Sequence, residues 1–343
     1  MRKALTIAAV AAGTALLARG LRRGASLRGR VVLITGGSRG LGLVLARKLV
    51  RSGARIAICA RDERELGRAR DHLAALGGEV LAVTCDVRIP AAAERLLETV
   101  VAHYGRLDVL INNAGIIEVG PARTMSLQDY RSVMGVNFWG AVHTTLAALP
   151  HLRRSALARI VNVTSIGGAI PVPHLLPYTC SKFAMVGFSE GLAVELAPEG
   201  VRVTTVLPGM MRTGSFVNAL FKGQRAREVS WFSLGAALPI ASMSAERAAR
   251  RILLACARGE RFLTLGLPFK ALRIAQALAP GMSIAVLGVL ARLLPEADGA
   301  DPGELAEPGW LHRRGVARGP LLALGNRAAR RNLEVPWASP EPG

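Results

Sequence analysis

Residues 176–185 read LPYTCSKFAM and place Tyr178 and Lys182 four residues apart. On a helix this spacing puts two side chains on one face, about one turn apart. An ammonium group near a tyrosine stabilises the phenolate, so such a pair can give and take a proton at a reacting oxygen. In an arbitrary protein the same spacing more often belongs to a solvated helix surface, and the rest of the sequence has to decide. Cys180, between the pair, is interpreted as a small packing residue rather than a redox thiol.

The elements that must position this pair alternate between strand-like and helix-like segments. Near-continuous apolar strands separated by helices are typical of a parallel sheet covered on both faces. We therefore predict an α/β fold, a doubly wound, Rossmann-type parallel sheet of about seven strands with helices on both faces. Such a sheet binds its ligands beyond the carboxyl ends of the strands. The predicted strands are the apolar, β-rich runs at 31–35, 55–60, 80–85, 107–112, 159–164, 201–207 and 261–266.

A glycine-rich loop, TGGSRGLG at 35–42, joins the first predicted strand to the first predicted helix. Its glycines permit a tight turn and let the backbone approach a pyrophosphate, and the helix N-terminus offers free N–H groups and a partial positive charge. A glycine-rich turn without a ligand is the alternative. The position of the loop in a strand–loop–helix unit favours a dinucleotide site.

This loop and several later motifs resemble the short-chain dehydrogenase/reductase family, whose nucleotide loop reads T-G-x-x-x-G-x-G. The resemblance covers about residues 30–265. It implies that Asp86 in CDV holds the adenine, that NNAG at 112–115 lies under the cofactor, and that PGMMRT at 208–213 contacts the nicotinamide side. The implied cofactor-binding residues are Thr35, Gly36, Ser38, Arg39, Gly40, Leu41, Gly42, Arg61, Asp86, Val87, Asn113, Ala114, Gly115, Tyr178, Lys182, Pro208, Gly209 and Thr213.

The resemblance also implies a catalytic tetrad of Asn137, Ser165, Tyr178 and Lys182. Tyr178 would be the general acid in reduction and the general base in oxidation. Lys182, helped by the positive charge of oxidised nicotinamide, would lower the pKa of Tyr178 and would bind the nicotinamide ribose. Ser165 would hold and polarise the carbonyl oxygen. Asn137, on a predicted helix, would position a water that links Lys182 to solvent. The predicted reaction is hydride transfer between a nicotinamide and a carbonyl or secondary alcohol.

The choice between NADP and NAD depends on the end of the second strand. An acidic residue there would accept the ribose hydroxyls of NAD and repel a 2′-phosphate. Ala60 and Arg61 occupy that stretch, and Arg39 lies in the glycine loop. Because guanidinium groups bind phosphate through charge-assisted hydrogen bonds, we predict NADP. Asp62 keeps NAD as the alternative.

The two ends of the chain differ in composition from the predicted catalytic domain at 29–266. Residues 1–28 contain an apolar run at 4–18 with basic flanks, shorter than the roughly 20 residues that span a bilayer. We predict a short anchor or interfacial helix that keeps the domain cytoplasmic, with a surface helix packed on the domain as the alternative. Residues 267–295 form an apolar extension that could contact a membrane, and 296–343 a basic, poorly ordered tail.

The segment 214–240 interrupts the strand–helix rhythm and is expected to form the substrate loop. Its aromatic and apolar residues, together with the apolar sequence after 266, predict a pocket for a hydrophobic small molecule, lipid-, steroid- or acyl-like, supplied from a membrane surface. Core packing would explain much of the same apolar character. The aromatic residues of this segment are Phe216, Phe221, Trp231 and Phe232.

The net charge of +20 comes almost entirely from arginine, because only five of the 44 basic residues are lysines. We predict no nucleic-acid partner, since no zinc spacing, aromatic-rich basic strand or recognition helix accompanies the charge. The four cysteines are far apart and the six histidines are scattered. That pattern predicts a reducing compartment and no metal centre.

Two other functions remain open. A non-catalytic nucleotide sensor or scaffold could use the same fold, but it would be expected to have lost Tyr178 or Lys182. A membrane-surface or nucleic-acid-binding protein driven by charge would bind in a strongly salt-dependent way without NADP. The family resemblance further implies a homo-oligomer.

Overall fold

A seven-stranded parallel sheet forms the centre of the computed structural model, which describes residues 24–237, 242–297, 301, 303–315 and 320–335. The strand order is β11-β7-β6-β4-β1-β2-β3. Every strand lies within two residues of its predicted bounds, and the predicted fold class is confirmed. The strands are β1 (Val31–Thr35), β2 (Arg55–Ala60), β3 (Val80–Thr84), β4 (Val109–Asn112), β6 (Arg159–Val163), β7 (Arg202–Pro208) and β11 (Phe262–Leu265).

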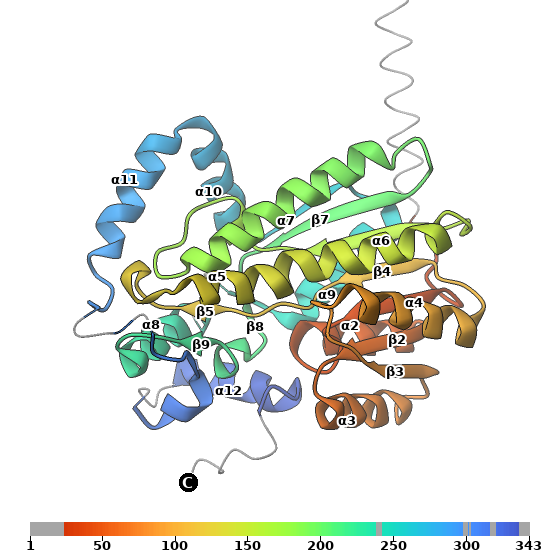
Figure 1. Cartoon of the computed structure of the whole chain (residues 1–343), viewed down its shortest axis with the longest axis horizontal. Helices are drawn as coiled ribbons and strands as arrows, with labels where there is room; N and C mark the ends of the chain where they lie inside the picture. Colours follow the sequence, from red (N-terminus) through yellow and green to blue (C-terminus); the bar gives the residue numbers. More distant parts are fainter. Residues whose placement is uncertain (1–23, 238–241, 298–300, 302, 316–319, 336–343) are drawn as a thin grey trace, which may run out of the picture.

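Helices cover both faces of this sheet (Figure 1). Successive side chains of a strand point to opposite faces, so Val32 and Ile34 of β1 enter one core and Val31 and Leu33 the other. Helices α2, α3 and α9 pack on the first core, and α4 and α6 on the second. The bounds are α2 (Gly40–Arg51), α3 (Glu63–Ala74), α4 (Pro90–Tyr104), α5 (Leu127–Met134), α6 (Gly140–Leu152), α7 (Leu176–Glu195), α8 (Arg225–Ala237) and α9 (Ala245–Arg258).

Local signals set several of these helix ends. The Asp62 side chain accepts from the backbone N–H of Glu65 and caps α3, and Ser126 and Asp129 form a capping box on α5. Helix α4 ends at Gly105, whose φ of 74° is favourable only for glycine. A π-helical turn (Gly135–Trp139) separates α5 from α6, and such turns are frequent at functional sites.

Short elements surround the carboxyl edge of the main sheet. Strand β8 pairs with β10, and β9 pairs with β5 and β12. These elements are β5 (Glu118–Val119), β8 (Met210–Arg212), β9 (Leu220–Phe221), β10 (Ser242–Ser244) and β12 (Glu307–Pro308), and the 3-10 turns Ala122–Thr124, Ile166–Gly168, Ser215–Val217 and Gly309–Gly315.

Helices α10 (Leu267–Leu278) and α11 (Pro280–Ala291) form a hairpin that stands out from the body (Figure 1). Neither helix has a buried residue. None of the helices in the described part of the chain has both the length and the apolar character needed to cross a membrane. The anchor or interfacial helix predicted for 1–28 lies almost wholly in 1–23, outside the described residues.

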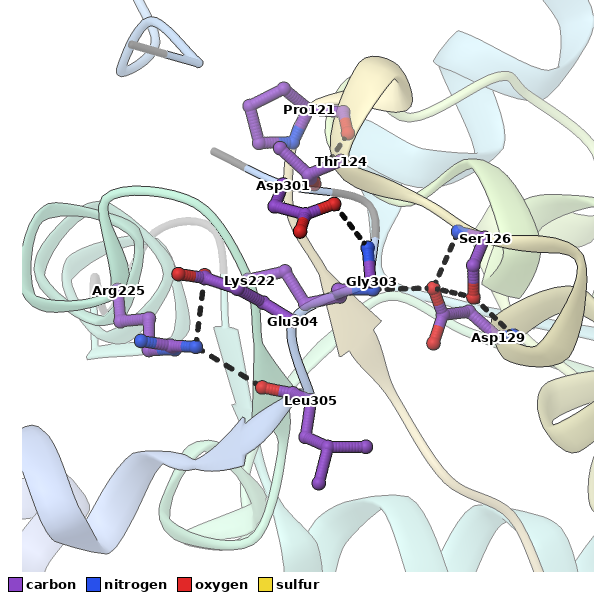
Figure 2. Close-up of polar contacts among 10 residues, drawn as sticks. All are labelled: Pro121, Thr124, Ser126, Asp129, Lys222, Arg225, Asp301, Gly303, Glu304 and Leu305. Carbon is purple, nitrogen blue, oxygen red and sulfur yellow. Dashed lines mark hydrogen bonds and ion pairs between the residues drawn. The ribbon is translucent and has the colours of Figure 1, made fainter. Parts of the chain in front are cut away.

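The prediction of a poorly ordered tail at 296–343 is wrong for much of its described part. Helix α12 (Pro320–Arg331) contacts α8, and Ala329 is buried in a cluster with Phe216. Figure 2 shows that Arg225 donates to the Glu304 carboxylate and the Leu305 carbonyl. The basic composition suggested disorder, but small apolar residues on one face of α12 provide a packing surface.

The pH dependence of stability tests the burial of the Glu118 carboxyl group in β5. Burial and the nearby charge of Asp129 raise the pKa of Glu118 to about 8, and Asp129 is itself paired with Lys222 at 2.7 Å (Figure 2). The native state therefore keeps this proton up to about pH 8, whereas the unfolded chain loses it near pH 4.5. Stability should decline as pH rises through this window.

We predict that Glu118→Gln, which is neutral at every pH, removes this decline. The free energy of unfolding of the variant should rise relative to that of the parent protein between about pH 5 and pH 8. Denaturant titrations at the two pH values measure the difference. An identical pH dependence in both proteins would show that Glu118 is ionised in the native state.

Candidate active site

A cleft of about 850 Å³ lies at the carboxyl edge of the main sheet. Residues that follow β1, β2, β4, β6 and β7 line it, as expected for a sheet whose parallel strands all end at the same edge. All but two of the predicted cofactor-binding residues line this cleft, and the exceptions are Thr35 and Gly42.

Thr35 and Gly42 shape the glycine loop instead. The Thr35 hydroxyl accepts from the backbone N–H groups of Asn113 and Ala114, each at 3.0 Å. A Cβ on Gly42 would overlap the carbonyl oxygen of Gly36, and one on Gly36 would lie 2.8 Å from the Ala114 Cα. Gly36 also has a φ of 64°. These contacts leave a bare backbone cradle at the N-terminus of α2, which fits the phosphates of a dinucleotide.

Tyr178 and Lys182 lie together inside this cleft and not on a solvated helix surface. Both project from α7, and Lys182 is 5% exposed. The Lys182 Nζ lies 5.6 Å from the centre of the Tyr178 ring and donates to the Val163 carbonyl at 3.3 Å. Burial lowers the pKa of Lys182 to about 8. Tyr178 and Lys182 therefore lie in the same partly desolvated cleft as the glycine loop.

Burial raises the pKa of Tyr178, and a hydrogen bond with Ser165 opposes that shift. The lowering of this pKa by Lys182 and an oxidised nicotinamide concerns the cofactor-bound site and stays a prediction. Gly168 allows α7 to come this close to the Ser165 turn, because a Cβ on Gly168 would lie 2.5 Å from the Lys182 carbonyl oxygen.

Asn137 lies in the π-helical turn, where the sequence predicted an ordinary helix. Its amide nitrogen donates to the Ile116 carbonyl at 3.0 Å and to the Ser181 hydroxyl at 2.9 Å, and its oxygen accepts from the Ile116 N–H at 2.8 Å. Three hydrogen bonds thus tie the segment after β4 to α7. The side chain positions the site, and its predicted role in holding a water stays a prediction.

The substrate end of the cleft is apolar. Of the four aromatic residues predicted there, Trp231 and Phe232 line the cleft, whereas Phe216 and Phe221 are buried in the core. Phe269 of α10 also lines it and comes from the apolar sequence after 266, which was expected to contribute to the pocket.

A buried carboxylate orients the Trp231 side chain. Glu228 accepts from the Trp231 indole at 2.6 Å, and its other oxygen lies 2.8 Å from the His174 Nδ1. His174 has a φ of 59°, a strained conformation for a residue with a side chain. Cys180 is exposed, in contrast to its interpretation as a small packing residue.

The phosphate end contains acidic residues that the sequence analysis missed. Arg39 donates to both oxygens of Glu65 at 2.6 Å, and its Nε lies 3.5 Å from a carboxylate oxygen of Glu334. Arg61 lines the cleft and is exposed. Asp86 pairs with Arg88, which lowers the pKa of Asp86. Within the described ranges no three His, Cys, Asp or Glu side chains are grouped to hold a metal ion.

Gly42→Ala tests the packing of the glycine loop. The added Cβ meets backbone that cannot move aside, so the variant should lose about 1–3 kcal/mol of unfolding free energy. The control is Gly67→Ala in α3, where a Cβ would have no neighbour within 4 Å; it should gain up to about 1 kcal/mol. Denaturant unfolding measures both. Equal stability of the two variants would contradict the close approach.

The sequence of this chain is similar to those of known proteins. Residues 30–222 match the family model described as short chain dehydrogenase. The 11-beta-hydroxysteroid dehydrogenase-like 4A protein of Arabidopsis thaliana is 38% identical over 57% of this chain, which spans 66% of that protein's length. A putative ketoacyl reductase of Streptomyces coelicolor is 38% identical over 53% of this chain and 71% of its own.

The solved structures include similar folds. The 3-ketoacyl-(acyl-carrier-protein) reductase of Brucella melitensis, complexed with NADH, superimposes with a TM-score of 0.59 at 25% identity. The superposition covers 70% of this chain and 98% of that one.

Proposed function

This chain belongs to the short-chain dehydrogenase/reductase family of oxidoreductases, and on that premise we propose that it is an NADP-dependent enzyme. It transfers a hydride between the nicotinamide and the carbonyl or secondary alcohol of a hydrophobic substrate. The observation that supports this proposal most strongly is the convergence of Ser165, Tyr178 and Lys182 on the cleft that also contains the glycine loop.

The side chains at the centre of the cleft have complementary tasks in this proposal. The bound dinucleotide supplies or accepts the hydride. In reduction, negative charge develops on the substrate oxygen, and Tyr178 donates its proton to that oxygen while Ser165 holds it by a hydrogen bond. The Lys182 ammonium stabilises the phenolate that remains. In oxidation the phenolate takes the proton back from the alcohol.

Arg39 and Arg61 support NADP over NAD, because both line the cleft and can pair with a 2′-phosphate. Phosphate groups would lie against the glycine loop at the N-terminus of α2, and Lys182 would bind the nicotinamide ribose. The relative crystallised with NADH keeps NAD as the alternative cofactor.

The apolar wall formed by Trp231, Phe232 and Phe269 supports a hydrophobic carbonyl compound as substrate. The names of the hydroxysteroid dehydrogenase-like and ketoacyl reductase relatives are in keeping with such a compound. A non-catalytic nucleotide sensor on the same fold has less support, because Tyr178 and Lys182 are both retained. The homo-oligomer implied by the family stays a prediction.

Tyr178→Phe tests the proton-transfer role. Loss of the hydroxyl should reduce turnover of a ketone by roughly 10²–10⁴-fold while dinucleotide binding stays largely intact. The matched control is Tyr130→Phe, because Tyr130 does not line the cleft; its turnover should match that of the parent protein. Steady-state oxidation of NADPH measures both, and parental turnover in Tyr178→Phe would rule out the assignment.

The α10–α11 hairpin supports a membrane contact at the cytoplasmic face. Helix α11 has no charged residue, and large apolar side chains near the tip are exposed, among them Leu278 and Met282. Lys270, Arg273 and Arg292 lie toward the base. An apolar tip with a basic base suits the surface of an anionic bilayer, and Phe269 connects that base to the substrate end of the cleft.

The double substitution Leu278→Glu and Met282→Glu tests this contact. Two charges at the tip should lower affinity for vesicles of phosphatidylcholine and phosphatidylserine by roughly tenfold or more. Leu305→Glu is the control, because Leu305 is 84% exposed but lies outside the hairpin. Co-sedimentation with vesicles measures binding. Unchanged binding of the double variant would exclude the hairpin as the contact and leave residues 1–28 as the candidate.

A further inference from the structure

The segment after α12 returns to the glycine loop, about 290 positions along the chain from it. We refer to residues 332–335 as the C-terminal strap. The backbone N–H of Gly40 donates to the Asn332 carbonyl at 2.9 Å. The buried Asn332 side chain donates to the Thr213 carbonyl at 3.2 Å and accepts from Arg47 at 3.2 Å. The strap thus joins the glycine loop to the segment that follows β8.

The strap places the Glu334 carboxylate on the glycine loop. Glu334 is 5% exposed and lines the cleft. Its oxygen Oε2 accepts from the Asn218 amide at 2.7 Å and lies 3.5 Å from the Nε of Arg39. A Cβ on Gly40 would overlap the other carboxylate oxygen. The carboxylate therefore rests where the loop has no side chain.

Helix N-termini and glycine loops attract negative charge, and in this protein the Glu334 carboxyl group occupies that position. Burial raises the pKa of Glu334, whereas the charge of Arg39 and the hydrogen bond from Asn218 oppose that shift and favour the carboxylate. Glu65 already binds Arg39 through both of its oxygens. A phosphate that enters the loop meets the negative charges of Glu65 and Glu334, and it must share Arg39 with them.

We propose that Glu334 is a cofactor-selecting residue, an internal anion that weakens dinucleotide binding in proportion to the phosphate charge of the ligand. This inference rests on the proposed nicotinamide chemistry of the cleft. NADP carries one more phosphate than NAD, with a charge of about −1.5 to −2 near neutral pH. Glu334 therefore opposes NADP more strongly than NAD and limits the NADP preference that Arg39 and Arg61 confer.

Glu334→Gln tests the proposal in the full chain, because glutamine can keep the hydrogen bond from Asn218 while losing the charge. Dissociation constants of NADPH and NADH are measured by fluorescence titration at low and high salt. The variant should bind NADPH roughly tenfold more tightly, should bind NADH with a smaller gain, and should lose much of the difference at high salt.

Two further variants make the comparison specific. Glu63→Gln removes one negative charge from the exposed start of α3, outside the cleft, and should leave the ratio of the NADPH and NADH constants unchanged. Glu65→Gln removes the other carboxylate on Arg39 and should shift the ratio toward NADPH. It keeps the test informative if thermal unfolding shows that Glu334→Gln does not fold.

The outcomes separate this proposal from the function on which it rests. If the parent protein binds both dinucleotides but Glu334→Gln leaves the ratio unchanged or weakens both, the strap is only structural and the proposal is overturned. If the parent protein binds neither dinucleotide, the proposed function fails, and the inference fails with it.

Discussion

The site depends on one positive charge held inside the protein. Transfer of an ammonium group from water to a protein interior is costly, and the pKa of about 8 for Lys182 reflects this cost. The Val163 carbonyl accepts a hydrogen bond from this ammonium group. The close packing of α7 on Gly168 holds the Lys182 backbone near that carbonyl. Because a group with this pKa is largely protonated at neutral pH, an ammonium remains beside the Tyr178 ring, where a phenolate would form.

Parallel strands explain why the remaining parts of the site meet. The glycine loop, the segment after β4 and the Ser165 turn each follow a strand, so all three lie at one edge of the sheet. The C-terminal strap does not follow a strand, and it lies beyond the region matched by the family model. The candidate catalytic residues thus come from the shared fold, whereas one of the acidic residues beside the glycine loop, Glu334, comes from the C-terminal strap.

The sequence predicted what depends on local patterns and missed what depends on distant packing. Apolar runs located all seven strands, and the glycine spacing located the dinucleotide loop. Glu334 was missed because it reaches the cleft from the C-terminal strap, which has no counterpart in the strand–helix rhythm. Phe269 lies in the apolar sequence after 266, which was expected to contribute to the pocket, although no single residue of it could be chosen. The raised pKa of Tyr178 could not be predicted from the sequence because it depends on burial, which spacing along α7 does not reveal. The basic composition of the C-terminal segment likewise gave no indication of α12, because Ala329 is buried only through contact with a cluster that is distant in the sequence.

The most direct test of the account is the transfer of deuterium from C4-labelled reduced nicotinamide dinucleotides to a panel of lipid-soluble ketones. Both cofactors and both C4 stereoisomers are tested, and the products are analysed by mass spectrometry. The account predicts a product alcohol with deuterium on its carbinol carbon. A folded protein that binds the dinucleotide yet labels no member of the panel would contradict the catalytic account and favour a nucleotide sensor.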